Sequence, residues 1–281
     1  MTLDDLRTRL DQRKSGKLSL IGLPSDVNSS YLPGTAEAPP FIREALFSEA
    51  ANMWTETGVD LGVDGTFFDA GDLALEDDPW NTAEEAIHLL LRHDLPPIVL
   101  GGDHAITYPV VRAFSGKFPQ LGILHFDAHP DLYHSFENNP NSHASPFARI
   151  MENGLASRLV QIGIRTATGH QREQAEKFGV EMIEMRHFDS DTRIAFDGPV
   201  YVSVDIDGLD PAYAPGVSHP EPGGLSTRQV LNTIQAFEGK LVGADIVEVN
   251  PRKDLNNITS IVAAKILKEI AGRIISDGLD R

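Results

Sequence analysis

Two short segments of the chain carry acidic and histidine side chains at every second position. Asp127, His129 and Asp131 follow one another at this spacing, and Asp205 and Asp207 repeat it further along the chain. In an extended segment this spacing places the side chains on one side of the backbone. Carboxylates gathered on one side repel one another unless a cation lies between them, so the pattern indicates a metal site. The alternative is a pair of solvated acidic turns.

Charge counting indicates how many cations the site would hold. The four aspartates carry four negative charges, which two divalent cations would cancel. The candidate ligands are His104, Asp127, His129, Asp131, Asp205 and Asp207. Six side chains cannot fill two separate octahedral shells, so some carboxylates must bridge. Oxygen and imidazole ligands without sulfur favour manganese over zinc, and we expect two Mn²⁺ per chain. Two such ions roughly 3.5–4 Å apart would hold a bridging water and supply hydroxide near neutral pH.

Apolar segments of strand length lead into these polar residues. Strands are expected at 97–100, 121–126, 200–204 and 241–249, and the apolar part of the last one, 241–247, runs into Glu248. Asn81 with Glu84, and Ser226 with Gln229, are typical of capping boxes at helix starts. Further strands are expected at 17–23, 159–164 and 180–185, and further helices at 41–48, 145–152, 170–178, 226–237 and 258–275.

The alternation of strands and helices favours one fold class. Nearly uninterrupted apolar strands between helices indicate an α/β protein, with a mostly parallel sheet between two layers of helices. We expect one three-layer domain over residues 1–281. In such a sheet, ligands bind beyond the carboxyl ends of the strands. One polar cluster at a strand end could be a solvated loop, but four at the same end of one sheet indicate a binuclear metal site.

The overall composition excludes several other kinds of protein. The 281 residues include 24 Lys+Arg and 41 Asp+Glu, so the net charge of −17 disfavours binding to nucleic-acid phosphates. No cysteine is present, which excludes thiol nucleophiles and thiolate metal sites. No apolar run reaches the roughly 18 residues of a membrane span, and the acidic start does not resemble a signal peptide. We expect a cytoplasmic protein without nucleic-acid or membrane partners.

Four motifs, in this order along the chain, resemble the ureohydrolase family of arginases and agmatinases. They are Gly-Gly-Asp-His at 101–104, Asp-Ala-His-Pro-Asp at 127–131, Ser-Val-Asp-Ile-Asp-Gly-Leu-Asp-Pro at 203–211 and Glu-Val-Asn-Pro at 248–251. Residues 142–150 and 214–224 are particularly similar to plant-type arginases. The resemblance covers residues 20–271. It implies an arginase/deacetylase-like fold and an amidinohydrolase that releases urea from a small guanidino substrate.

The resemblance also implies a role for each matching residue. The six candidate ligands match the family's manganese ligands, with Asp127 and Asp205 bridging the two ions. His143 matches the active-site histidine, and Glu248 matches the glutamate that binds the guanidinium. The other four ligands would divide between the ions, His104 and Asp131 for the first and His129 and Asp207 for the second.

The implied chemistry is consistent with the properties of a guanidinium. Resonance makes its carbon a poor target for neutral water, whereas a metal-bridging hydroxide held by Asp127 is a stronger nucleophile already in place. The leaving amine must gain a proton, and His143 is the expected carrier because its unperturbed pKa is ~6.5. Glu248 would pair with the guanidinium nitrogens. Related guanidine-processing enzymes with a thiol nucleophile are excluded by the missing cysteine.

The sequence leaves the choice of guanidino substrate open between two compounds. L-Arginine has an α-carboxylate that agmatine lacks, so an arginase needs hydrogen-bond donors around the pocket. The segment 134–142 offers Asn138, Asn139 and Asn141, although these asparagines could instead form turns. With Glu248 and His143 they are the expected substrate contacts. Similarity to plant-type arginases favours arginine, giving L-ornithine and urea. The alternative is agmatine or another guanidino compound; agmatine would give putrescine and urea.

Two other classes of protein are also compatible with a metal site. One is a catalytically silent metal-binding protein, although such a site would need neither His143 nor Glu248. The other is a single-zinc amide hydrolase such as a deacetylase. Family members form trimers or hexamers, so a homo-oligomer is expected. Of the neighbouring residues, Asp103 and Asp210 are expected to hold loops by hydrogen bonds, His125 to lie in the core, and His134, His219 and Glu221 have open roles.

Overall fold

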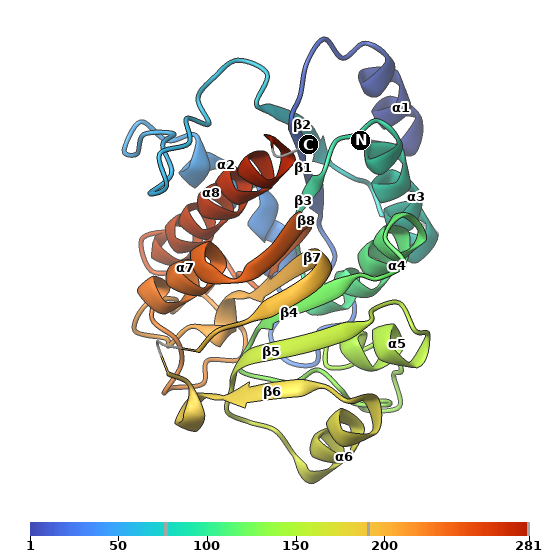
Figure 1. The fold of residues 1–281 in the computed structure, drawn as a ribbon, viewed down its shortest axis with the longest axis vertical. Coiled ribbons are helices and arrows are strands. Elements are labelled where there is room, and N and C mark those ends of the chain that lie inside the picture. Colours follow the sequence, from blue (N-terminus) through green and yellow to red (C-terminus); the bar gives the residue numbers. More distant parts are fainter. Residues whose placement is uncertain (76–77, 190–191, 280–281) are drawn as a thin grey trace.

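The strands form a single sheet in the computed structural model, which describes residues 1–75, 78–189 and 192–279. Every pairing between described strands is parallel, and the strand order is β2-β1-β3-β8-β7-β4-β5-β6 (Figure 1). All carboxyl ends therefore lie along one edge of the sheet. The strands are β1 Leu18–Leu23, β2 Phe67–Asp72, β3 Pro97–Gly101, β4 Gly122–Phe126, β5 Arg158–Ile164, β6 Glu181–Glu184, β7 Ala195–Asp205 and β8 Glu238–Val247.

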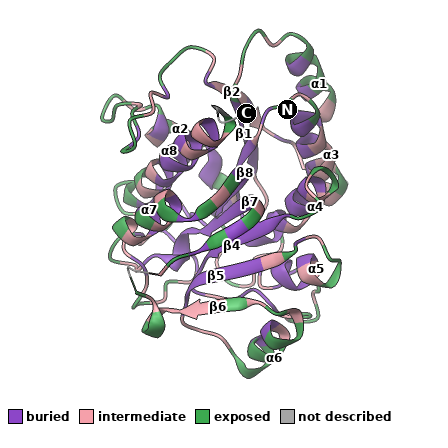
Figure 2. Cartoon of the chain, viewed as in Figure 1, coloured by how far each residue is buried: buried purple, intermediate pink, exposed green. Residues whose placement is uncertain are grey.

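Helices cover both faces of this sheet. Three of them pack on one face: α2 Ala38–Leu46, α7 Thr227–Ala236 and α8 Ile258–Leu279. Five contribute to the hydrophobic cluster on the other face: α1 Leu3–Asp11, α3 Pro79–Arg92, α4 Thr107–Lys117, α5 Pro146–Glu152 and α6 Gly169–Phe178. In Figure 2 the central strands are buried along most of their length, and the exposed surface lies on the outer sides of the helices. This is the expected three-layer α/β architecture.

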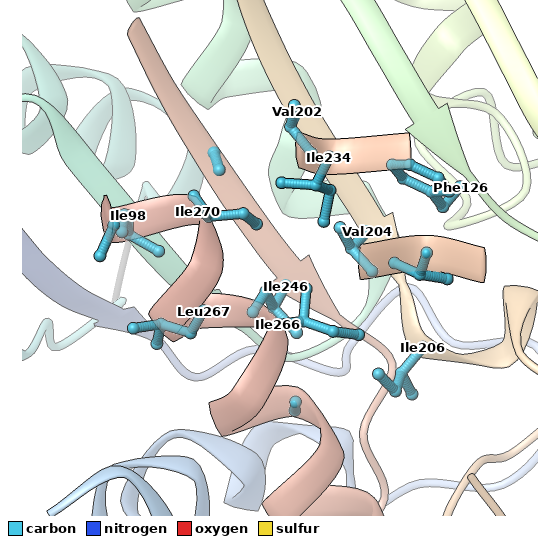
Figure 3. Packing of buried hydrophobic residues seen from close by; sticks show 14 of the residues in the cluster. Ile98, Phe126, Val202, Val204, Ile206, Ile234, Ile246, Ile266, Leu267 and Ile270 are labelled. Carbon is cyan, nitrogen blue, oxygen red and sulfur yellow. The ribbon is translucent and has the colours of Figure 1, made fainter. Parts of the chain in front are cut away.

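Alternation along the strands divides the core into two parts. Ile98 and Leu100 of β3 belong to the cluster under α8, whereas Val99 between them belongs to the cluster under α3 and α4. Figure 3 shows the first cluster, in which Ile266 and Ile270 of α8 face the sheet. Strands buried on both faces have no polar alternation, which is why they read as continuous apolar runs in the sequence.

The seven expected strands are all present, but three elements were not expected. The edge strand β2 contains Asp69, Gly71 and Asp72, so it has little strand character in the sequence. Helix α1 is short, and α4 contains Pro109 and Gly116, which weaken a helical pattern. Tertiary contacts hold two of these elements in place: α4 packs against α3, and β2 pairs with β1.

Asn81 does not cap a helix, which corrects the prediction from its spacing to Glu84. Helix α3 begins at Pro79, and the carboxylate of Asp78 accepts the hydrogen bond from the Asn81 N–H at 3.2 Å. Proline is favoured in the first helical turn because it lacks the N–H that would be unsatisfied there. The capping box of Ser226 and Gln229 is confirmed at the start of α7.

Strands β3 and β4 are consecutive in the chain but are not neighbours in the sheet. The later strands β8 and β7 lie between them (Figure 1). The four strands that end in polar clusters are therefore adjacent, in the order β3-β8-β7-β4. This topology brings residues more than 100 positions apart to the same point of the sheet edge.

Candidate metal centre and active site

His104 forms the centre of a first group of candidate ligands. It follows β3 in a short 3-10 turn, His104–Ile106, and its side chain is fully buried. Its Nδ1 atom lies 3.1 Å from Oδ2 of Asp131 and 3.3 Å from Oδ2 of both Asp127 and Asp205. Among the described residues this buried nitrogen has no hydrogen-bond partner. An unpartnered imidazole nitrogen facing three carboxylate oxygens fits a cation held by these four side chains.

His129 forms a second group that shares one carboxylate with the first. Its Nδ1 atom lies 3.3 Å from Oδ1 of Asp127 and 3.2 Å from Oδ2 of Asp207. These three residues have ligand atoms close enough together to hold a metal ion. The two oxygens of Asp127 thus face different histidines, His104 and His129. This is the arrangement a bridging carboxylate requires.

The carboxylates of this cluster lie in a poor environment for negative charge. All four are buried, with at most 6% of any residue exposed. Burial, together with the negative charge of Asp127, raises the pKa of Asp131 to about 6. Burial and the charges of Asp207 and Asp127 raise the pKa of Asp205 well above its usual range. A buried cluster that is short of positive charge is the setting in which divalent cations would be stabilising.

The pKa values of the two candidate histidine ligands are raised by the neighbouring carboxylates, although burial would lower them. Burial alone would lower the pKa of His104, but the carboxylates of Asp127, Asp131 and Asp205 close to its Nδ1 atom raise it well above its usual range. His129 behaves in the same way beside Asp127 and Asp207. A histidine ring must give up the proton on its ligand nitrogen before that nitrogen can bind a cation. Metal binding at this site would therefore release protons.

A buried hydrogen-bond network orients His104. The Nε2 atom of His104 lies 2.9 Å from the hydroxyl of Ser203, and this hydroxyl donates to Asp245 at 2.6 Å. Asp245 also accepts hydrogen bonds from Tyr201 and Thr107, both at 2.8 Å. These bonds turn Nδ1 of His104 toward the carboxylates. Histidine ligands are commonly oriented in this way, by the hydrogen-bond partner of the ring nitrogen that does not bind the metal.

Glu248 and His143 lie together beside the metal-ligand cluster. Glu248 directly follows β8 and has a left-handed backbone with φ 63°, so the expected strand over 241–249 ends at Val247. Its Oε1 atom accepts a hydrogen bond from the His104 N–H at 3.0 Å and lies 2.8 Å from Nδ1 of His143. Burial would lower the pKa of His143, but the charge of Glu248 raises it to about 9. The pair provides a buried carboxylate and a proton carrier in contact.

The cluster opens into a cavity of about 170 Å³. Its described lining combines candidate ligands with residues that the sequence analysis did not single out. The lining residues are Ser30, His129, Asp131, Tyr133, Phe136, His143, Ala144, Thr166, Gln171, Asp205, Asp207, His219 and Glu248. None of them is lysine or arginine. Six were missed by sequence reasoning, because they lie in loops or at a helix start and follow no chemical spacing: Ser30, Tyr133, Phe136, Ala144, Thr166 and Gln171.

The three asparagines proposed as substrate contacts do not line this cavity. Asn139 pairs through its backbone with Phe136, and its side-chain amide donates to Asn28 at 3.1 Å. Asn138 has a left-handed backbone with φ 63°, and Asn141 N–H donates to the Asn139 side chain. Their observed contacts are those of turn residues, the alternative that the sequence left open.

The other residues with expected or open roles also have defined places. Asp103 is buried and accepts hydrogen bonds from the N–H groups of Asn28 and Ala105, and Asp210 accepts from Ala212, Gly223 and Gly224. His219 lines the cavity with its ring 5.2 Å from that of His143. His134 is largely exposed and lies 3.0 Å from Glu152, away from the cavity lining.

Arg165 connects the metal-ligand loop to the loop that carries His219. Its guanidinium donates 2.7 Å and 2.6 Å hydrogen bonds to the carbonyls of Asp207 and Glu221. Further bonds reach the carbonyls of Gly163, Gly208 and Leu209. Glu221 thus contributes its backbone oxygen to this connection. Nothing in the spacing of the sequence indicates this role.

Comparisons of the sequence and of the structure with known proteins point to one family. The family model described as "Arginase family" matches residues 16–272. The mitochondrial arginase of Medicago truncatula is 49% identical over 275 residues, covering 91% of this chain and 81% of that protein. An agmatinase of Bacillus cereus is 32% identical, covering 92% and 91% of the two chains. The solved arginase from Medicago truncatula superimposes with a TM-score of 0.90 at 45% identity, covering 96% and 93%.

The chain therefore belongs to the arginase family. It is a hydrolase of the kind that acts on a guanidino C–N bond, which confirms the resemblance inferred from its motifs. The similarity to plant arginases is confirmed as well. Within the residues that the structure describes, no helix combines the length and apolarity needed to cross a bilayer.

Proposed function

We propose that this protein hydrolyses L-arginine to L-ornithine and urea with two Mn²⁺ ions bound per chain. The observation that carries the proposal is the contact between Glu248 and His143 next to the cluster of four buried aspartates. Similarity to the arginases of plants supports arginine as the substrate. The metals would be held by His104, Asp127, His129, Asp131, Asp205 and Asp207.

The side chains around the cavity have separate tasks in this proposal. Two divalent cations held by the six candidate ligands would supply hydroxide at neutral pH by lowering the pKa of bound water. The carboxylate of Glu248 pairs with the guanidinium and orients its carbon toward the metal ligands. His143 holds a proton in contact with this pair and delivers it to the departing amine. Glu248 and His143 are both buried, so water screens their charges only weakly.

Agmatine is the second candidate substrate, and one observation favours it. No lysine or arginine is among the described residues that line the cavity. The α-carboxylate of arginine would therefore bind neutral donors such as the Gln171 amide or the His219 ring, whereas agmatine has no carboxylate to bind. The similarity to a Bacillus cereus agmatinase agrees with this alternative.

Urea release from four guanidino compounds tests the proposal. The manganese-loaded protein is incubated with L-arginine, agmatine, 4-guanidinobutyrate and guanidine, with the Asp127→Ala variant as the inactive control. Urea from arginine at the highest kcat/KM is the expected result. Urea from agmatine alone would change the substrate and keep the mechanism. No urea from any compound would contradict the proposal and favour a catalytically silent metal-binding protein.

Metal content, assembly and location are separate parts of the proposal. We expect two manganese ions per chain after dialysis, whereas one tightly bound zinc would favour an amide hydrolase such as a deacetylase. We expect a trimer or hexamer, which light scattering would measure. We also propose a cytoplasmic location; because several plant relatives are named mitochondrial, cell fractionation is the appropriate measurement.

A further inference from the structure

Ser30 contacts the proton carrier of the site from the side opposite Glu248. It lies in the loop between β1 and α2 and lines the cavity. Its hydroxyl oxygen is 2.8 Å from Nε2 of His143, and its backbone N–H donates to the same nitrogen at 3.2 Å. Nδ1 of the ring is 2.8 Å from Glu248. The imidazole is therefore held at both of its nitrogens.

The segment that carries Ser30 is anchored to the surrounding site. The N–H of Asn28 donates to the buried carboxylate of Asp103 at 2.9 Å, and its carbonyl accepts from the N–H of His143 at 3.2 Å. The side-chain oxygen of Asn28 accepts from Asn139 at 3.1 Å. Two segments, one at Asp103 and one containing Asn139 and His143, thus fix the loop next to the histidine. The position of Ser30 relative to the imidazole is defined by these bonds.

The two polar groups of Ser30 suit different protonation states of His143. A backbone N–H can only donate, so it suits the neutral ring, whose Nε2 carries a lone pair. A hydroxyl can also accept, so it suits the imidazolium, whose Nε2–H needs an acceptor. A proton carrier passes through both states in each turnover. The hydroxyl can rotate and keep a hydrogen bond to Nε2 in either one.

Several charged groups favour the protonated ring in which the hydroxyl is needed. Burial lowers the pKa of His143, but Glu248 raises it most strongly, and Asp131 and Asp103 add to the rise. His219 is a further titratable neighbour; its ring packs against that of His143, and burial lowers its own pKa.

We propose that Ser30 is a positioning residue that keeps the His143 ring in one orientation in both of its protonation states. The inference rests on the proposed role of His143 as the proton carrier. No bond is made or broken at Ser30, because it exchanges only hydrogen bonds with the ring. Its removal should therefore slow proton delivery without weakening the binding of the guanidinium to Glu248.

Steady-state kinetics of two variants test this role. Ser30→Ala removes the hydroxyl and keeps the backbone N–H, and Ser30→Thr restores a hydroxyl. We expect Ser30→Ala to lower kcat about 3- to 10-fold, the size of one hydrogen bond, with KM within about 2-fold of the parent. Ser30→Thr should recover most of kcat. A rise in KM without a fall in kcat would overturn the proposal, as would a fall in kcat that threonine does not recover.

A matched control lies one residue away. The hydroxyl of Ser29 is buried in the same segment and has no hydrogen-bond partner among the described residues. Ser29→Ala should therefore keep the parental kcat, which would show that shortening a serine in this segment does not itself slow the reaction. A kcat loss in Ser29→Ala as large as that in Ser30→Ala would assign the effect to the loop as a whole and overturn the proposal.

A second readout does not depend on activity. In the metal-free protein, the pKa of His143 is measured by NMR of labelled imidazole, with His143→Gln to assign its signal. Loss of the hydroxyl acceptor should lower this pKa by about 0.5 to 1 in Ser30→Ala, and Ser30→Thr should restore it. An unchanged pKa in Ser30→Ala would overturn the proposal. Because this measurement needs no turnover, absence of urea release would contradict the proposed function and leave the role of Ser30 testable.

Discussion

His125 donates a hydrogen bond from Nε2 to Oδ2 of Asp127, the carboxylate shared by the two groups of candidate metal ligands, over 2.9 Å. The direction of the bond follows from the other ring nitrogen. Nδ1 accepts from the amide of Gln161 at 3.0 Å, so the proton of the neutral ring is on Nε2. Burial lowers the pKa of His125 to about 4, so the ring is neutral near pH 7. The expected core histidine thus also orients a ligand.

Replacing His125 by phenylalanine should weaken metal binding. His125→Phe keeps an aromatic ring against Phe147 but removes the donor to Asp127. Loss of such a partner commonly costs about 10- to 100-fold in metal affinity. Competition with a chelator would measure the loss. The exposed His187 offers a control, since His187→Phe should bind manganese as the parent does, and equal affinity in both variants would contradict the prediction.

The charge of Glu248 should be needed for the guanidinium and not for the metals. Glu248→Gln keeps the acceptor for the His104 N–H but removes the negative charge. A charged hydrogen bond to the substrate is lost, so KM should rise about 10- to 100-fold. Metal analysis should still find the parental manganese content. Unchanged KM would remove Glu248 from the guanidinium site, and loss of metal would make it a part of the metal centre.

Arg165 should be required for the stability of the loops around the cavity. Arg165→Met removes one donor from each of five backbone carbonyls, including those of Asp207 and Glu221, although the Gly208 carbonyl keeps the Leu225 N–H. Unpaired carbonyls near the metal-ligand loop should lower the free energy of unfolding by roughly 2–4 kcal/mol and raise KM. Urea unfolding and steady-state kinetics measure the two effects. The exposed Arg186 serves as the control, and a loss equal to that of Arg186→Met would count against the prediction.

The His143–Glu248 pair should make the stability of the metal-free protein depend on pH. The pKa of His143 is about 9 in the folded state against 6.5 in its ordinary state. The folded chain therefore binds this proton more tightly, and the resulting stabilisation is complete below about pH 6.5 and lost as the pH rises through about 9. A difference of this size corresponds to roughly 3 kcal/mol.

Urea unfolding at about pH 6 and about pH 9.5 would measure this dependence. The parent should lose more free energy of unfolding between the two pH values than His143→Gln, which has no ionisable group at this position. Because His143 also lowers the pKa of Glu248, the difference between the two proteins reports the His143–Glu248 pair as a unit. Equal losses in the two proteins would show that the pair does not contribute.

The candidate metal ligands could be proposed from the sequence because their chemistry is local. Asp127, His129 and Asp131 follow one strand end, but the backbone bends at residues 128–129 and is left-handed at Asp131 with φ 51°. These side chains therefore converge through a turn, and not through the alternation of an extended segment that their spacing predicts. The parallel sheet then brings this group to Asp205 and Asp207, since all carboxyl ends share one edge. Resemblance to the family added His143 and Glu248, whose contact of 2.8 Å no local pattern encodes.

The cavity walls could not be predicted in the same way. Ser30 and Gln171 reach the cavity from segments that are 141 residues apart in the chain, and neither has a periodic pattern around it. The asparagine prediction followed from donor chemistry, but a loop asparagine also satisfies its own backbone, as Asn139 does with Phe136. Which of these two uses prevails depends on packing against distant residues such as Asn28.

The position of β7 and β8 between β3 and β4 has a consequence for synthesis of the chain. A growing polypeptide that has reached β6 contains two separate sets of strands, each with an unpaired central strand edge. Such edges are prone to associate with other chains, so the incomplete protein should depend on chaperones until the last two strands insert. Glu248 follows β8 in the chain. The protein can therefore bind substrate only after β7 and β8 have paired in the middle of the sheet.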